Sequence, residues 1–189
     1  MNIELSIPQG YEDITIRDYK ELRRIIGSDR TEQQKSLDII RTLCRVDSKD
    51  LKRVQHSDMQ NVMGMLSWVF DEPSTRQELI RKFELNDKVY GFIPNMSRLT
   101  IAEFADLDTY SENGYDNLEH IMSVLYRPVC LEIRDFYEIE PYDNTRHHHS
   151  IMEDMPMNVA MSAMVFFYNI ERALAVDTHN FSARVSRVG

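Results

Sequence analysis

The chain has 189 residues, the size of one ordinary domain, and its 42% hydrophobic and 28% charged residues are typical of a folded globular protein. Its formal net charge of -9 argues against nonspecific binding to nucleic acid, because that affinity comes from cations that displace the counterions of phosphates. The sequence has neither the pattern of a signal peptide nor an apolar run of about 18 residues. We therefore expect an intracellular protein that does not span a membrane.

The first part of the chain is predicted to be helical. Residues 3–7 alternate apolar and polar side chains and predict a short, half-buried strand. Helical spacing of apolar side chains then predicts four helices within residues 12–70. Thr31 and Gln34 have the spacing of a capping box at the start of the second helix.

A β-hairpin is predicted over residues 80–94. Strand-forming side chains alternate on either side of Asn86 and Asp87, which are typical turn residues. The N-terminal strand could join this hairpin in a small sheet.

The remainder is predicted to be helical over residues 98–176, followed by a C-terminal tail at 177–189. Thr100 has the spacing of a capping box with Glu103, at the start of a helix through Ile101, Phe104 and Leu107. A following helix has to end before Pro128.

The sequence pattern leaves the secondary structure of one segment of this second half open and predicts that of another clearly. Residues 131–139 fit a strand or a helix equally well. Residues 157–176 form the longest apolar helical segment and are predicted to be the central core helix. The predicted fold class is mainly α with a small β-hairpin or sheet (α+β), in a single compact domain over residues 1–189.

The cysteines and histidines do not predict a metal site. Cys44 and Cys130 each lie in an apolar pattern and predict buried free thiols in a reducing compartment. His147, His148 and His149 are adjacent, whereas zinc ligands are usually spaced as in HExxH or CxxC. We expect a polar loop here, with no metal and no other cofactor, and a pH-sensitive loop is the alternative.

Catalytic patterns are also missing from the sequence. Asp106 with Asp108, or Glu138 with Glu140, could pair as acid and base, but a solvated acidic face is the simpler interpretation. The sequence contains no GxSxG, GxxxxGK[ST] or GxGxxG pattern. We expect a protein that is not an enzyme and has no catalytic residues.

Charge and methionine content favour binding of another polypeptide. Between residues 101 and 145 the only basic residues are Arg127 and Arg134, among many acidic ones. This acidic region could steer a basic or amphipathic segment, while flexible methionines and tyrosines supply apolar anchors. Arg127 is also expected to act as a structural clamp on nearby carboxylates or carbonyls. The residues predicted to contact a partner are Asp106, Asp108, Glu112, Tyr126, Arg127, Tyr137, Met155 and Met157.

Several motifs in order along the chain resemble a little-characterised group of tailed-bacteriophage proteins. The first is IP…Y-x-D-I-T-hydrophobic-x-x-Y, and the second is hydrophobic-T-hydrophobic-x-E-F-x-D-L. An N-L-x-x-I…L-Y-R-P-hydrophobic element, a Y-E-I-x-P-Y element and an M-P-hydrophobic…FF helix follow. They occupy Ile7–Tyr19, Leu99–Leu107, Asn117–Val129, Tyr137–Tyr142 and Met155–Phe167.

The resemblance implies a phage morphogenesis or virion protein without enzymatic activity. It favours a tail assembly chaperone that binds the tape-measure polypeptide or other tail proteins in the host cytoplasm. The alternatives are a permanent virion component, such as a connector or tail-completion protein, and a phage-encoded regulatory or host-interaction module. Neither nucleic acid nor a membrane is an expected partner, and a homo-oligomer is compatible with the sequence.

Overall fold

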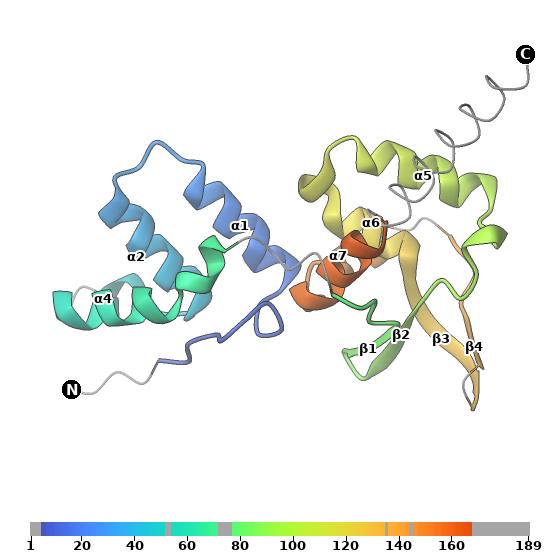
Figure 1. The fold of residues 1–189 in the computed structure, drawn as a ribbon, viewed down its shortest axis with the longest axis horizontal. Helices are drawn as coiled ribbons and strands as arrows, with labels where there is room; N and C mark the ends of the chain where they lie inside the picture. The colour runs from blue at the N-terminus through green and yellow to red at the C-terminus, as the bar shows by residue number, and fades with distance from the viewer. Residues whose placement is uncertain (1–4, 52–53, 72–76, 135, 144–145, 168–189) are drawn as a thin grey trace, which may run out of the picture.

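The computed structural model describes residues 5–51, 54–71, 77–134, 136–143 and 146–167 (Figure 1). It has a mixed α+β fold, as the sequence predicts. The elements in chain order are α1 (Ile16–Ile26), α2 (Glu32–Leu43), α3 (Ser48–Leu51), α4 (His56–Met65), η1 (Ser67–Phe70), β1 (Lys82–Leu85), β2 (Lys88–Phe92), η2 (Met96–Arg98), α5 (Ile101–Ser111), η3 (Gly114–Asn117), α6 (Leu118–Leu125), β3 (Tyr126–Ile133), β4 (Phe136–Ile139) and α7 (Arg146–Met152). A further helix occupies residues 157–167.

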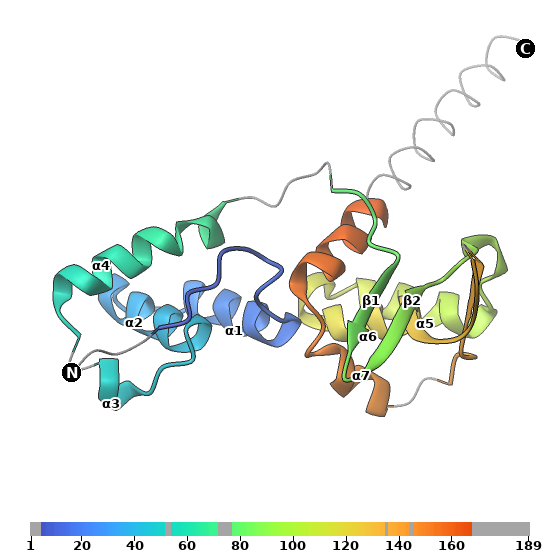
Figure 2. The same cartoon turned by 90° about the horizontal axis from the view of Figure 1, so that it is seen from below.

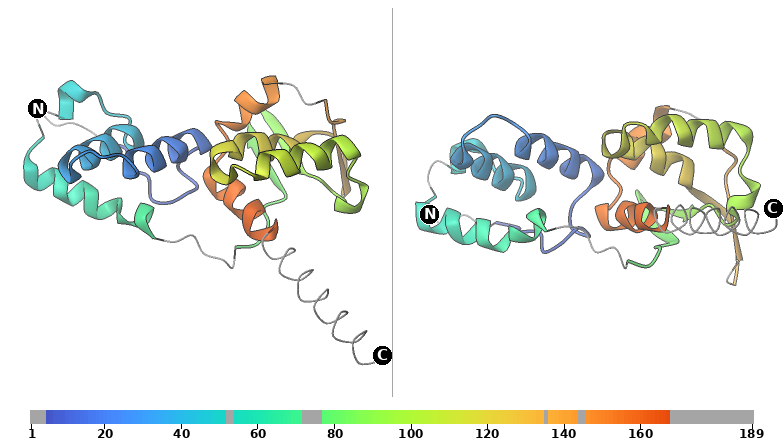
Figure 3. Two further views of the ribbon diagram at one scale, coloured as in Figure 1. Left: turned by 90° about the horizontal axis from the view of Figure 1, so that it is seen from above. Right: turned by 45° about the horizontal axis from the view of Figure 1, so that its top comes forward.

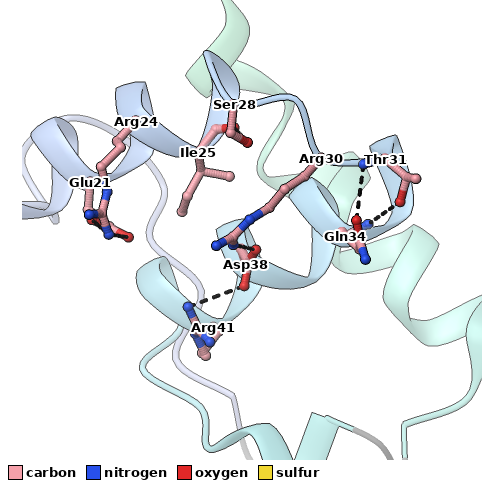
Figure 4. Close-up of polar contacts among 9 residues, drawn as sticks. All are labelled: Glu21, Arg24, Ile25, Ser28, Arg30, Thr31, Gln34, Asp38 and Arg41. Carbon is pink, nitrogen blue, oxygen red and sulfur yellow. Dashed lines mark hydrogen bonds and ion pairs between the residues drawn. The ribbon is translucent and has the colours of Figure 1, made fainter.

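The N-terminal helices form one end of the molecule in Figure 1, with α1 and α2 packed together and α4 beside them. Figure 4 shows the turn from α1 to α2, where Thr31 and Gln34 exchange hydrogen bonds of 3.2 and 3.3 Å in the expected capping box. In the same view Asp38 forms ion pairs with Arg30 of the turn and with Arg41 of α2, and the pair with Arg30 ties the turn to the body of α2. Local side-chain chemistry therefore fixes where α2 begins.

The sheet is antiparallel with the strand order β1-β2-β3-β4. Asn86 and Asp87 connect β1 to β2 with φ values of 52° and 59°, the backbone of a tight hairpin turn. The predicted N-terminal strand is wrong over residues 5–7, which belong to no strand, and its residues 3 and 4 lie outside the described residues. The strands that join the hairpin come instead from residues 126–139.

The interpretation of residues 98–176 as helical is therefore wrong at β3 and β4. Residues 131–139, left undecided between strand and helix, belong to this strand pair apart from residue 135, which lies outside the described residues. Pro128 has no N–H and suits a strand better than a helix, and its backbone pairs with Tyr90 of β2. The strand forms because β2 supplies a partner that is distant in sequence.

The two faces of the sheet meet different helices. Successive side chains of a strand point to opposite faces of a sheet. Tyr126 and Arg127 are neighbours in β3, so their side chains lie on opposite faces. On one face the ring of Phe92 lies 5.2 Å from that of Tyr126 and 5.5 Å from that of Phe166, in helix 157–167. Figure 2 shows this helix, in red, beside β1 and β2. On the other face Arg127 contacts Glu103 of α5. Residues 168–176 of the predicted core helix and the predicted tail at 177–189 lie outside the described residues.

A short backbone bridge connects the two ends of the molecule, which lie side by side in Figure 3. Thr15 pairs with Pro156, the Ile16 amide donates to Met155 at 3.0 Å, and the Met157 amide donates to Ile14 at 2.8 Å. One hydrophobic cluster contains side chains from the N-terminal helices, the sheet and helix 157–167.

Candidate partner-binding surface

A buried ion pair fixes the start of α5 against the sheet. Arg127 Nη1 of β3 lies 2.7 Å from Glu103 Oε1, and the two side chains are only 8% and 6% exposed. Glu103 also accepts hydrogen bonds of 2.7 Å from the Thr100 amide and from its hydroxyl, which completes the predicted capping box. The expected clamp on a carboxylate by Arg127 is thus present in the structure.

The electrostatics of this pair favour the charged state. Burial by itself would raise the pKa of Glu103, but the hydrogen bonds from Thr100 and the positive charge of Arg127 outweigh it and hold the pKa below its ordinary value. Arg127 Nε is buried and has no acceptor among the described residues. The guanidinium therefore retains one N–H that Glu103 does not satisfy.

Tyr137 of β4 lies beside this pair on the same face of the sheet. Its hydroxyl donates to the Phe92 carbonyl at 2.6 Å, and burial raises the pKa of this hydroxyl although the charge of Arg81 acts to lower it. The ring lies so close to Gly91 that a Cβ built there would be 2.5 Å from a ring carbon. Glycine at this position is what lets the aromatic ring approach β2 this closely.

A groove opens between the segment 93–99, the start of α5 and β4. Its volume is about 720 Å³. Its lining residues are Arg81, Ile93, Pro94, Asn95, Arg98, Leu99, Glu103, Arg127, Phe136, Tyr137, Glu138 and Ile139. We name it the arginine groove after Arg81, Arg98 and Arg127.

Large apolar side chains are exposed on the elements that flank the arginine groove. On α5, Ile101 is 91% exposed and Phe104 is 65% exposed. On the β3–β4 hairpin, Ile133 is 58% exposed and Phe136 is 55% exposed. Large apolar side chains that are exposed on elements beside a groove are typical of surfaces that bind another molecule.

The predicted acidic residues do not act alike. Asp106 accepts a hydrogen bond of 2.6 Å from the Tyr142 hydroxyl, and burial together with this carboxylate raises the pKa of Tyr142. Asp108 and Glu112 are exposed on α5 and just beyond its end. Asp106 is therefore held within the fold, and only the other two are open to solvent.

Three of the predicted apolar anchors belong to the core. Met155 and Met157 are fully buried, and Tyr126 is 1% exposed with its hydroxyl donating to the Ile80 carbonyl at 2.7 Å. The interpretation of these three side chains as surface anchors is wrong, because the folded chain already covers them. Tyr137 and Arg127 are also mostly buried, but both line the arginine groove.

The residues that flank and line this surface were mostly missed by sequence reasoning. Ile101 and Phe104 were predicted only as members of a helix, and the structure buries Glu103 while it leaves both apolar side chains exposed. The capping box was the sequence signal for the buried position of Glu103, since a carboxylate that is bound to Thr100 can also pair with Arg127. Arg81 and Arg98 carried no sequence signal.

The histidine segment is not a loop in the structure. Residues 146–152 form α7, and the ring of His149 lies 4.3 Å from that of His120. Burial and then the neighbouring His120 lower the pKa of His149. Within the described ranges, no group of three His, Cys, Asp or Glu side chains is arranged to hold a metal ion. Cys44 is buried as expected, whereas Cys130 is exposed, and both are free thiols.

Comparison of the chain with protein-family models, curated protein sequences and solved structures finds no match. None of the helices in the described part of the chain is both long and apolar enough to cross a membrane.

Proposed function

We propose that the protein is a non-enzymatic bacteriophage tail-assembly or structural protein that binds other phage polypeptides, with a chaperone of the tape-measure polypeptide as the favoured role. The observation that carries the proposal is the set of exposed apolar side chains on α5 and the β3–β4 hairpin. Water contact with such side chains is unfavourable, and a partner that covers them gains their transfer free energy.

The charge on α5 supports a polypeptide partner over nucleic acid. Asp108 lies on the same helix as Ile101 and Phe104, one turn after Phe104, and Glu112 directly follows that helix, so carboxylates border the exposed apolar side chains. Carboxylates repel phosphates, whereas they keep an exposed apolar surface soluble and attract basic segments. A chaperone that acts in the host cytoplasm needs both properties.

The proposal is tested by co-expression with the tape-measure protein and the other tail proteins of the same phage, followed by affinity purification. Replacement of Ile101 and Phe104 by serine should abolish co-purification. The matched control replaces Met65 and Phe70, which are 58% and 57% exposed at the opposite end of the molecule, and should leave it intact. Equal loss of co-purification in the two variants would refute the proposal. Absence of every tail protein from the wild-type sample would refute it as well.

Quantitative mass spectrometry of purified virions distinguishes a tail assembly chaperone from a permanent virion component. A chaperone leaves the assembled tail, so the protein should be absent from particles. A fixed copy number in every particle would instead establish the virion component.

A further inference from the structure

The arginine groove has a charge opposite to that of the whole chain. Glu103 offsets Arg127 at 2.7 Å. Arg81 and Arg98 are exposed at the groove, and no carboxylate in the described ranges forms an ion pair with either. The other acidic lining residue is Glu138. Three arginines against two glutamates leave the groove cationic in a chain of net charge -9.

We propose that the arginine groove binds an acidic side chain, aspartate or glutamate, that lies within an apolar segment of the partner polypeptide. This inference deepens the proposed function, because it assigns one docking site and one chemical class of segment to the partner. It reverses the sequence expectation at this location: the partner supplies the carboxylate and the protein supplies the cations.

The donor groups of the groove suit a carboxylate. Guanidinium groups offer flat pairs of N–H donors that match the two oxygens of a carboxylate. Arg81 and Arg98 have such donors free of any carboxylate, and Arg127 retains an unsatisfied, buried Nε. A buried donor without an acceptor is costly, so a carboxylate held in the groove beside Arg127 offsets part of that cost.

The apolar walls of the groove require apolar neighbours on the segment. Ile93, Pro94 and Leu99 form one side, and Phe136 of β4 lines the groove as well. A volume of about 720 Å³ fits a short piece of chain with a few side chains rather than a folded domain. The side chains of Ile101 and Phe104 lie on the adjoining helix, where the segment can continue.

The floor of the groove is rigid before any partner binds. Tyr137 is fixed by its bond to the Phe92 carbonyl and by contact with Gly91, and Arg127 is fixed by Glu103. A preformed site loses little conformational entropy on binding, which favours recognition of a flexible segment.

The test uses the full chain and three synthetic peptides that carry capped ends. The acidic probe has the sequence Gly-Leu-Phe-Glu-Phe-Leu-Gly, and the other two have glutamine or lysine in place of the central glutamate. Fluorescence anisotropy of labelled peptides measures affinity. Nitrogen-15 NMR of the arginine Nε–H groups reports whether the Arg127 resonance moves when a peptide binds.

The acidic peptide should bind at least tenfold more tightly than the glutamine peptide and should shift the Arg127 Nε–H resonance. R98E, and separately R81Q, should weaken binding of the acidic peptide about tenfold. K49E changes the charge as much as R98E does, at an exposed position of α3, and should leave binding unchanged. Circular dichroism confirms that each variant is folded.

Three outcomes overturn the inference. Equal binding of the acidic and glutamine peptides would make the groove merely apolar. Tighter binding of the lysine peptide would make the acidic side chains of α5 the recognition element. A shift of the Arg127 resonance by inorganic phosphate but not by the acidic peptide would make the groove a site for small anions.

The failure of this inference is distinguishable from the failure of the proposed function. If tail proteins co-purify equally with wild type and R98E, the proposed function stands and the groove is not the docking site. If the acidic peptide binds as expected but no tail protein co-purifies, the groove is a binding site and the proposed phage function is wrong.

Discussion

Replacement of Arg127 by methionine should destabilise the protein strongly, because Glu103 then loses its counterion in a site where its side chain is 6% exposed. Removing one partner of a buried ion pair costs about 3–5 kcal/mol. The two hydrogen bonds from Thr100 remain and support the carboxylate, so we expect about 3 kcal/mol. For a chain of this size that corresponds to a fall in melting temperature of roughly 6–12 °C, measured by calorimetry at pH 7.

A double-mutant cycle identifies the cause. The change E103Q together with R127M removes both charges and should recover most of the lost stability, because neither side chain then carries an unpaired charge. The control R98M removes an exposed arginine of the same groove and should change stability by no more than about 0.5 kcal/mol. An unchanged melting temperature in R127M combined with lost partner binding would refute the clamp and assign Arg127 to recognition.

The pair also predicts how stability depends on acid. The pKa of Glu103 is lowered in the folded protein, so its contribution is fully present above the ordinary value of 4.5 and is lost as the pH falls through the folded value. Urea titrations between pH 7 and pH 3 should therefore show a shallower acid loss for the double variant E103Q and R127M than for wild type. Parallel curves of unfolding free energy against pH for the two proteins would mean that other carboxylates cause the loss of stability in acid.

Three further predictions concern other parts of the chain. G91A should destabilise the protein by about 1–3 kcal/mol in chemical denaturation, because the added Cβ overlaps the ring of Tyr137. At Gly64 an added Cβ meets no atom within 4 Å, so G64A should stabilise α4 by up to about 1 kcal/mol. Similar effects of the two variants would refute the close packing of Tyr137 on Gly91. The pKa of His149 is lowered in the folded protein, so its neutral form stabilises the fold above pH 6.5, and that contribution is lost as the pH falls below 6.5. H149Q should therefore reduce the slope of the unfolding free energy against pH between pH 7 and pH 5. An unchanged slope would show that His149 does not cause this pH dependence. Reversing the charges of Asp108 and Glu112 should slow association with a basic partner segment more than it speeds dissociation, as surface plasmon resonance at low and high salt would show; a salt-independent association rate would leave these charges a role in solubility alone.

Local chemistry in the sequence was sufficient for several elements. Capping boxes depend only on residues three positions apart, so Thr31 with Gln34 and Thr100 with Glu103 marked the starts of α2 and α5 correctly. The turn at Asn86 and Asp87 is equally local, because both residues tolerate positive φ.

Long-range partners decided the rest. The strands β3 and β4 could not be told from helix by their own residues, because a strand is stable only when another strand satisfies its backbone, and β2 is distant in sequence. Burial of Met155 and Met157 likewise depends on the backbone bridge to residues 14–16, which no local pattern reveals.

The spacing of apolar side chains along the chain predicted its fold class, and its charge and methionine content suggested a polypeptide partner. Only the tertiary structure placed Arg81, Arg98 and Arg127 around one groove, since they come from three segments that the fold brings together. The sequence predicted the helix of Ile101 and Phe104 but not which of its sides meets the sheet. In the structure Glu103 of α5 faces Arg127, and Ile101 and Phe104 are exposed. The candidate surface therefore depends on a tertiary ion pair.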